Sequence, residues 1–287
     1  MGGPLQSLLL LAAGAGVLPF LVGLVRLRRP VAGTSPWPPA ASILACALAF
    51  NLTFFWQELW LVIPKALVPG LSPVLYHNDH GWTGSAPIAQ LLQGTGALAT
   101  LCSGLASFAA LRAGRGLSAG ARLLLFWLAF QGLFQSLTQW AVGSLLPGND
   151  VGRALAYLGA NGMAKAALCA ASIATMAAAG RALAAQAPAG LADSRASGSR
   201  AFASALLATG LGCVVLSVPF REPRDLVEVV LVPALVCLLG IGWLVFGSTL
   251  GRVREQPETR IGSMRLLLAL AVLLALFQGV LRSGVRF

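Results

Sequence analysis

The chain has 287 residues, of which 57% are hydrophobic and only 10% are charged. Soluble domains carry about 25% charged residues, so this composition excludes an ordinary soluble globular protein. The net charge of +11 would suggest nucleic-acid binding in a soluble chain. Here the arginines fall in short clusters between apolar runs, as membrane orientation requires, and we expect no nucleic-acid partner.

Long apolar runs dominate the sequence. A helix needs about 20 apolar residues to cross a bilayer, and eight runs meet that length: 5–25, 40–63, 87–111, 121–146, 154–180, 202–220, 226–248 and 264–282. These runs are uniformly apolar and lack the alternation typical of strands. The sequence therefore predicts an all-α, polytopic transmembrane bundle of about eight spans.

The segments between these runs alternate in charge. Arginines dominate the segments after the first, third, fifth and seventh runs, whereas the other segments mix acidic and basic residues. Lys and Arg accumulate on the cytoplasmic side of membrane proteins. The alternation predicts that both termini lie outside the cytoplasm, in a cell membrane of the bacterial type.

One flexible stretch divides the chain. Residues 184–200 begin with AAQAPAGLADSRASG, which is small, polar and interrupted by Pro and Gly, as linkers are. We expect a cytoplasmic linker here. It separates residues 1–183, with five spans and an outer loop at 65–86, from residues 201–287, with three spans.

Polar side chains inside the apolar runs indicate a site. Ionisable residues in membrane spans are expensive and mark functional positions. Glu58 lies in the second run and Lys165 in the fifth. Amide side chains occur in the third to fifth runs at Gln90, Gln93, Gln131, Gln135, Gln139 and Asn161. We expect the second to fifth spans to enclose one polar cavity that opens outward beneath the 65–86 loop.

Both histidines of the chain lie in that loop, as His77 and His80, on either side of Asp79. Imidazole and carboxylate groups are the usual ligands of zinc-like ions. One hypothesis is therefore a divalent metal site, for example for zinc, with the ligands His77, Asp79, His80 and Asp150. An HxxH pair in a loop is less specific than HExxH on a helix. The alternative is that the histidines bond the backbone of their own loop.

The remaining polar residues also have two interpretations. Glu58 and Lys165 are candidate catalytic groups, but a buried acid also needs a partner. Glu58 can pair with Lys165 or with Lys65, and we favour Lys165. The turn at Asn149 and Asp150 can hold a ligand, or it can cap the fifth helix. We assign substrate contacts to the amides Gln90, Gln93, Gln135, Gln139 and Asn161, for which interhelical hydrogen bonding is the alternative.

Three functions fit this pattern. The first is a metal-dependent membrane hydrolase that acts on a lipid-linked or peptide substrate at the outer face. The second is a non-catalytic subunit or assembly factor that docks a membrane protein partner. The third is a proton-coupled transporter, which the apolar cytoplasmic halves of the second to fifth runs disfavour.

Overall fold

The computed structural model describes residues 10–27, 40–114, 116–188, 191, 200–221, 227–250 and 261–287. Most of these residues are helical, in agreement with the predicted helical bundle. The α-helices are α2 (Leu18–Arg26), α3 (Ala40–Ala66), α4 (Ile88–Leu92), α5 (Gly94–Ala113), α6 (Ala119–Leu145), α7 (Asp150–Tyr157), α8 (Gly162–Ala184), α9 (Arg200–Ser217), α10 (Val232–Ser248) and α11 (Ser263–Leu276). Short π- or 3₁₀-helical segments adjoin four of them: η1 (Ala13–Val17), η3 (Val218–Phe220), η4 (Val227–Leu231) and η5 (Phe277–Leu281).

Six of the described helical segments are long and apolar enough to cross a membrane: Ala40–Ala66, Ile88–Ala113, Gly162–Ala184, Arg200–Phe220, Val229–Ser248 and Ser263–Leu281. They support the predicted membrane character. The apolar helix Leu10–Arg26 is shorter. Helix α6 has 27 residues, but its three glutamines and one arginine lower its hydropathy. Residues 28–39 and 251–260, which belong to two of the predicted arginine-rich connections, and most of the predicted linker 184–200 lie outside the described residues.

The fifth predicted span, 154–180, contains two helices rather than one. Helix α7 ends at Tyr157, and Gly159 then adopts a left-handed backbone with φ of +66°, a conformation that suits glycine. Helix α8 starts afresh, because the Oδ1 atom of Asn161 accepts a hydrogen bond of 2.8 Å from the backbone N–H of Ala164. Such a side chain caps a helix N-terminus, so the chain turns here instead of continuing.

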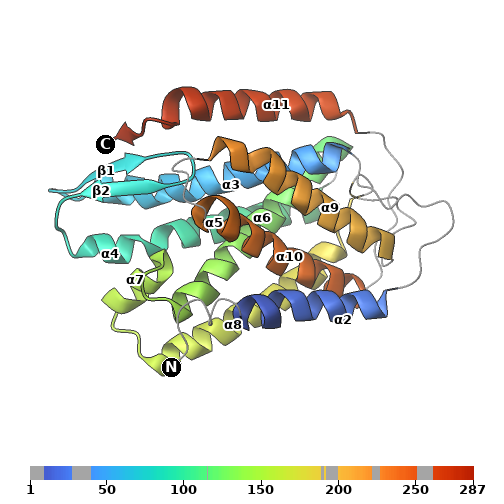
Figure 1. The fold of residues 1–287 in the computed structure, drawn as a ribbon, viewed down its shortest axis with the longest axis horizontal. Coiled ribbons are helices and arrows are strands. Elements are labelled where there is room, and N and C mark those ends of the chain that lie inside the picture. Colours follow the sequence, from blue (N-terminus) through green and yellow to red (C-terminus); the bar gives the residue numbers. More distant parts are fainter. Residues whose placement is uncertain are drawn as a thin grey trace.

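The predicted 65–86 loop contains a β-hairpin. Strands β1 (Ser72–Leu75) and β2 (His80–Thr83) pair antiparallel, with Leu75 opposite His80, and β1 also pairs with β3 (Val285–Arg286). The sheet order is β2-β1-β3. Figure 1 shows the hairpin, α4, α7 and the C-terminus together at the left end of the bundle. Strand β2 therefore lies at that end of the bundle.

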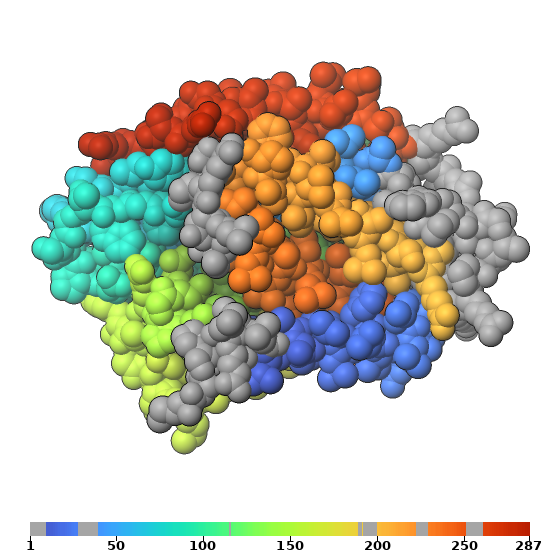
Figure 2. Space-filling model, in the orientation of Figure 1, coloured from blue at the N-terminus to red at the C-terminus, as the bar shows by residue number. Residues whose placement is uncertain are grey.

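Glycines allow the central helices to approach closely. A Cβ atom on Gly132 of α6 would lie 2.5 Å from the Cα atom of Gly104 in α5, and one on Gly247 of α10 would lie 2.6 Å from the backbone of Gly180 in α8. No larger residue fits at such crossings. The outer helices differ: the space-filling view in Figure 2 shows α11 along the upper edge, where Leu267, Leu268, Val272 and Leu276 are exposed.

Candidate functional site

The site begins with an acid and a histidine in direct contact. Glu58 of α3 is only 4% exposed, and its Oε2 atom lies 2.7 Å from the Nδ1 atom of His80 at the start of β2. It is the one ion pair within the described parts of the chain. The hairpin brings the two residues together, because both of its strands pack against α3 and β2 begins at His80.

The other nitrogen of His80 has its own partner. Its Nε2 atom lies 2.8 Å from the Oε1 atom of Gln93, and that oxygen also accepts a hydrogen bond of 2.8 Å from the Nζ atom of Lys65. A lysine ammonium can only donate, so the oxygen of Gln93 must face it. The same oxygen then accepts from His80, and Nε2 must carry a hydrogen.

The imidazole of His80 therefore donates from Nε2 and shares one further proton with the carboxylate of Glu58. Burial lowers the pKa of His80, but the hydrogen bond and charge of Glu58, helped by the charge of Asp150, raise the pKa above its usual value. Hydrogen bonds to a charged form favour that form. The geometry corresponds to an imidazolium and a carboxylate, with a proton held between the two residues.

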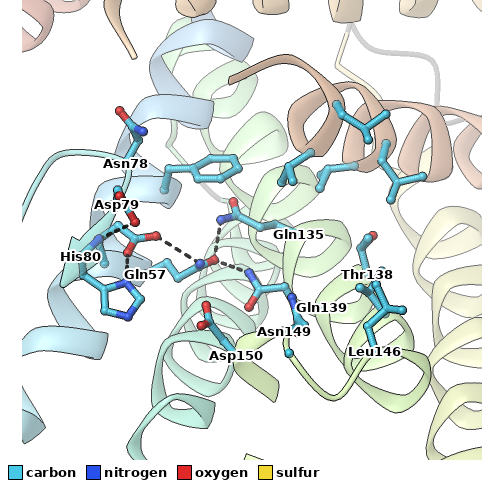
Figure 3. A pocket seen from close by; sticks show the side chains of 18 of the residues that line it. Gln57, Asn78, Asp79, His80, Gln135, Thr138, Gln139, Leu146, Asn149 and Asp150 are labelled. Atoms are coloured by element: carbon cyan, nitrogen blue, oxygen red, sulfur yellow. Dashed lines mark hydrogen bonds and ion pairs between the residues drawn. The ribbon is translucent and has the colours of Figure 1, made fainter. Parts of the chain in front are cut away.

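Gln57 continues the network from α3 to α6. Its Nε2 atom donates to Oε1 of Glu58 at 3.3 Å. Its Oε1 atom accepts from Nε2 of Gln135 at 2.6 Å and from Nε2 of Gln139. Because the carboxylate of Glu58 requires a donor, the amide of Gln57 has one orientation, and this orientation fixes the amides of both α6 glutamines. Figure 3 shows these bonds converging on Gln57.

These side chains form one wall of a cavity of about 420 Å³, a size typical of small-molecule sites. The polar wall comes from α3, the hairpin, α6 and the start of α7 (Figure 3). Most of the apolar lining residues, Leu231, Val232, Leu235 and Val236, belong to η4 and α10, and Figure 3 shows α10 on the other side of the cavity from His80. The cavity therefore has two chemically different sides.

Two further carboxylates line the cavity. Asp79 precedes His80 and accepts a hydrogen bond of 2.8 Å from its backbone N–H, while Asp150 stands in the first turn of α7. Burial is the main cause that raises the pKa of each carboxyl group above its usual value. The basic lining residue is Arg153, whose Nε atom donates to the backbone oxygen of Gly148 at 3.0 Å.

The structure brings together part of the set predicted from the sequence. The predicted residues that line the cavity are Glu58, Asp79, His80, Gln135, Gln139 and Asp150. Gln93 lies behind His80 and holds its ring. Asn149 caps α7, since its Oδ1 atom accepts from the N–H of Val151 at 3.2 Å, as the capping interpretation predicted.

Four predicted residues lie elsewhere: Gln90, Asn161, Lys165 and His77. Gln90 in α4 is exposed, and the exposed Asn161 caps α8. The predicted pair of Glu58 with Lys165 is wrong, because Glu58 pairs with His80 and Lys165 makes no ion pair with a described residue. Lys165 is half-buried in α8, a helix that contributes no described lining residue to the cavity.

His77 is separated from His80 by the turn of the hairpin. It is 1% exposed, and its ring stacks on Phe277 of η5 with the centroids 5.1 Å apart. Burial and the nearby positive charge of Arg221 lower its pKa to about 4. His77 is thus a neutral packing residue at neutral pH and does not line the cavity.

The donor set does not fit the predicted metal site. A histidine binds a metal through a ring nitrogen without a proton, but both ring nitrogens of His80 contact other side chains, and His77 is packed against Phe277. Within the described ranges, no group of three or more His, Cys, Asp and Glu residues is arranged to hold a metal ion.

Sequence reasoning assigned no role in the site to Gln57, Arg153 or the α10 wall. Gln57 had a signal, because Gln131, Gln135 and Gln139 recur on one helix face and buried amides need partners. Arg153 was assigned only to a mixed connecting segment. The apolar residues of α10 had no signal, since they resemble lipid-facing residues in composition. Comparison with protein-family models, with curated proteins and with solved structures finds no match to this chain.

Proposed function

We propose that this chain is a membrane-embedded acid–base enzyme that hydrolyses a lipid-linked substrate in the cavity beside the hairpin. The main observation behind this proposal is the contact of 2.7 Å between Glu58 and His80. It lies at the wall of a cavity with one polar and one apolar side. A buried acid held by a cation is a candidate general base. The apolar wall from α10 suits the chain of an amphiphile.

The residues have distinct roles in this proposal. Glu58 takes a proton from a water molecule while the oxygen of that water attacks the electrophilic centre of the substrate. The protonated Glu58 then gives the proton to the leaving group. His80 is a positioning residue, because its Nε2 atom faces Gln93 and its Nδ1 atom faces Glu58. It holds the carboxylate in place and stabilises its charge before the proton arrives.

We place the cavity at the extracytoplasmic end of about eight spans, with α6 and Leu10–Arg26 as spans and both termini outside. The described arginines at helix ends support this orientation. Five of them, Arg112, Arg122, Arg181, Arg200 and Arg265, lie at the end of the bundle opposite the hairpin (Figure 1). At the hairpin end, Arg153 is accompanied by the acidic residues Asp79 and Asp150, so the charge there is mixed. Positive residues favour the cytoplasmic side, which puts the hairpin outside.

A transporter gains no support from the interior of the bundle. It needs a polar route from the cavity to the other side, but there α3 and α6 pack the rings of Phe50, Phe126, Trp127 and Phe130, each fully buried. A subunit or assembly role likewise has no described contact that favours it over an enzyme.

The assay uses the purified protein in lipid nanodiscs with a bacterial polar lipid extract, and mass spectrometry detects the hydrolysis products. Glu58→Gln keeps the shape of the side chain but cannot accept the proton. We expect its rate to fall about 10²- to 10⁴-fold, while Lys165→Gln, a charge removal away from the cavity, leaves the rate unchanged. Equal rates for the wild type and Glu58→Gln, or no product at all, would overturn the proposal.

A chelator added to the same assay addresses the metal-dependent version predicted from the sequence. The mechanism through Glu58 predicts an unchanged rate. A rate that disappears with the chelator and returns with zinc would instead support a metal-dependent hydrolase.

A further inference from the structure

We infer that the cavity selects an amphiphile whose head group is a primary ammonium. As an assignment of the substrate class, this inference rests on the proposed hydrolase. As a statement about binding, it depends only on the cavity and can be measured without turnover. Three features of the described lining lead to it: buried acceptors without a partner, carboxylates without an ion pair, and an apolar wall.

The first feature is a group of acceptors without donors. Gln135 and Thr138 are 1% and 4% exposed. The Oε1 atoms of Gln135 and Gln139 and the Oγ1 atom of Thr138 have no hydrogen-bond partner within the described chain. Both amides already use their nitrogens on Gln57, so their oxygens cannot exchange places with donors. Buried acceptors without donors are costly, and a ligand with several N–H groups satisfies them.

The second feature is that more carboxylates than cations line the cavity, Glu58, Asp79 and Asp150 against His80 and Arg153, with Lys65 acting on Asp150 from outside the lining. Asp79 and Asp150 line the cavity, and neither forms an ion pair with a described residue. The positive lining groups are already engaged, because His80 pairs with Glu58, and Arg153 bonds Gly148 and lies with its Cζ atom 6.0 Å from the ring centre of Trp82. A cationic ligand therefore balances the cavity better than an anion or a neutral alcohol does.

The third feature separates a primary ammonium from a quaternary one. Quaternary ammonium groups are recognised by cages of aromatic rings, whereas the described lining contains one phenyl ring, that of Phe54. The carboxylates and amide oxygens instead suit a head group with three N–H donors. The apolar residues Leu231, Val232 and Leu235 face them across the cavity and accommodate the attached chain.

The test measures equilibrium binding of three probes to the full chain in nanodiscs, with empty nanodiscs subtracted: n-octylamine, n-octanol and N,N,N-trimethyl-octylammonium. We expect octylamine to bind at least 10-fold more tightly than either analogue. Asp150→Asn should weaken the binding of octylamine about 10-fold, and Thr138→Val should weaken it about 3- to 10-fold. Thr138 lies in α6, so its replacement does not disturb the N-terminus of α7 that adjoins Asp150. The control Gln90→Leu, at an exposed amide outside the cavity, should change nothing.

Octanol binding as tight as octylamine binding, or unchanged octylamine affinity in both variants, would overturn the inference. Tighter binding of the trimethylated probe would also overturn it. The catalytic proposal fails separately: if octylamine binds selectively to the wild type and equally to Glu58→Gln, but no lipid is hydrolysed, the ammonium site stands and the hydrolase does not.

Discussion

The two halves of helix α6 bury different kinds of side chain. In the half distant from the hairpin, Phe126, Trp127, Phe130 and Phe134 contact one another in sequence, with ring centroids 5.1–5.3 Å apart. In the half near the hairpin, Gln135 and Gln139 line the cavity, donate to Gln57 and leave their buried oxygens without a described partner. The first half buries mainly aromatic rings, and the second buries amides whose oxygens have no described partner. We conclude that stability comes mainly from the aromatic half and specificity from the glutamine half.

Removing a ring from the aromatic half should have the largest effect on stability. The ring of Phe130 packs on Gly240 of α10, where an added Cβ atom would lie 2.5 Å from the phenyl Cζ atom. Phe130→Ala leaves a cavity at this contact, so the free energy of unfolding should fall by about 3–5 kcal/mol. Unfolding in bicelles with increasing SDS measures it. Leu268→Ala, on the exposed face of α11, is the matched control, and equal losses for the two variants would remove the distinction between the halves.

The second prediction concerns His77, which lies at the hairpin end of the bundle but outside the cavity and therefore affects stability rather than binding. Its pKa of about 4 in the folded chain lies below the usual value of about 6.5, so the unfolded chain binds more protons between those values. Its contribution to stability is complete above about pH 6.5 and is lost as the pH falls toward 4, with a total of about 3 kcal/mol.

The measurement is the unfolding free energy at pH 7, 5.5 and 4.5 for the wild type and for His77→Phe. Phenylalanine keeps the stacking on Phe277 and cannot titrate, so the difference between the two proteins should grow as the pH falls. The raised pKa values of Asp79 and Asp150 are common to both proteins, so the contributions of these carboxyl groups cancel in the difference. If the difference were constant with pH, His77 would not be the packed neutral group that its surroundings indicate.

Gln57→Leu probes the polar half with a smaller expected loss. It removes the acceptor of Gln135 and Gln139 and the donor to Glu58. Hydrogen bonds between membrane helices contribute about 0.6 kcal/mol each on average, so we expect a loss of about 1–2 kcal/mol in unfolding free energy. The double variant Gln57→Leu, Gln135→Leu should be less destabilised than the sum of the two single variants, because the bond is already lost. Full additivity would mean that the two amides do not interact.

Much of this arrangement follows from composition and periodicity. Long apolar runs predict spanning helices because the bilayer leaves few alternatives. Glu58, Gln135 and Gln139 were identified because polar groups inside such helices must face a common interior. These arguments use only the properties of single helices, and they succeeded where one helix face decides the outcome.

Contacts between segments that are distant in the chain could not be predicted from the sequence. Strand β3 pairs with Val74 and Leu75 more than 200 residues earlier in the chain, and no local pattern of two residues indicates such a pairing. The separation of His77 from His80 depends on the turn, in which the N–H of Tyr76 bonds the oxygen of Asp79 at 2.9 Å. Spacing alone suggested that both imidazoles share one ion, and the hairpin register sends them to different neighbours.

Asn161 gives the smallest predicted effect, and it separates position from function. It lies at the end of the bundle that carries the hairpin and was assigned to the substrate, but its side chain caps α8 through Ala164. Asn161→Ala should lower the unfolding free energy by about 1 kcal/mol, and Asn161→Ser, which also caps helices, by much less. Neither variant should alter octylamine binding, because a cap acts on its own helix and the cavity lies on other elements. If Asn161→Ala lost octylamine affinity and Asn161→Ser kept it, the binding site would include α8, a helix that contributes no described lining residue to the cavity.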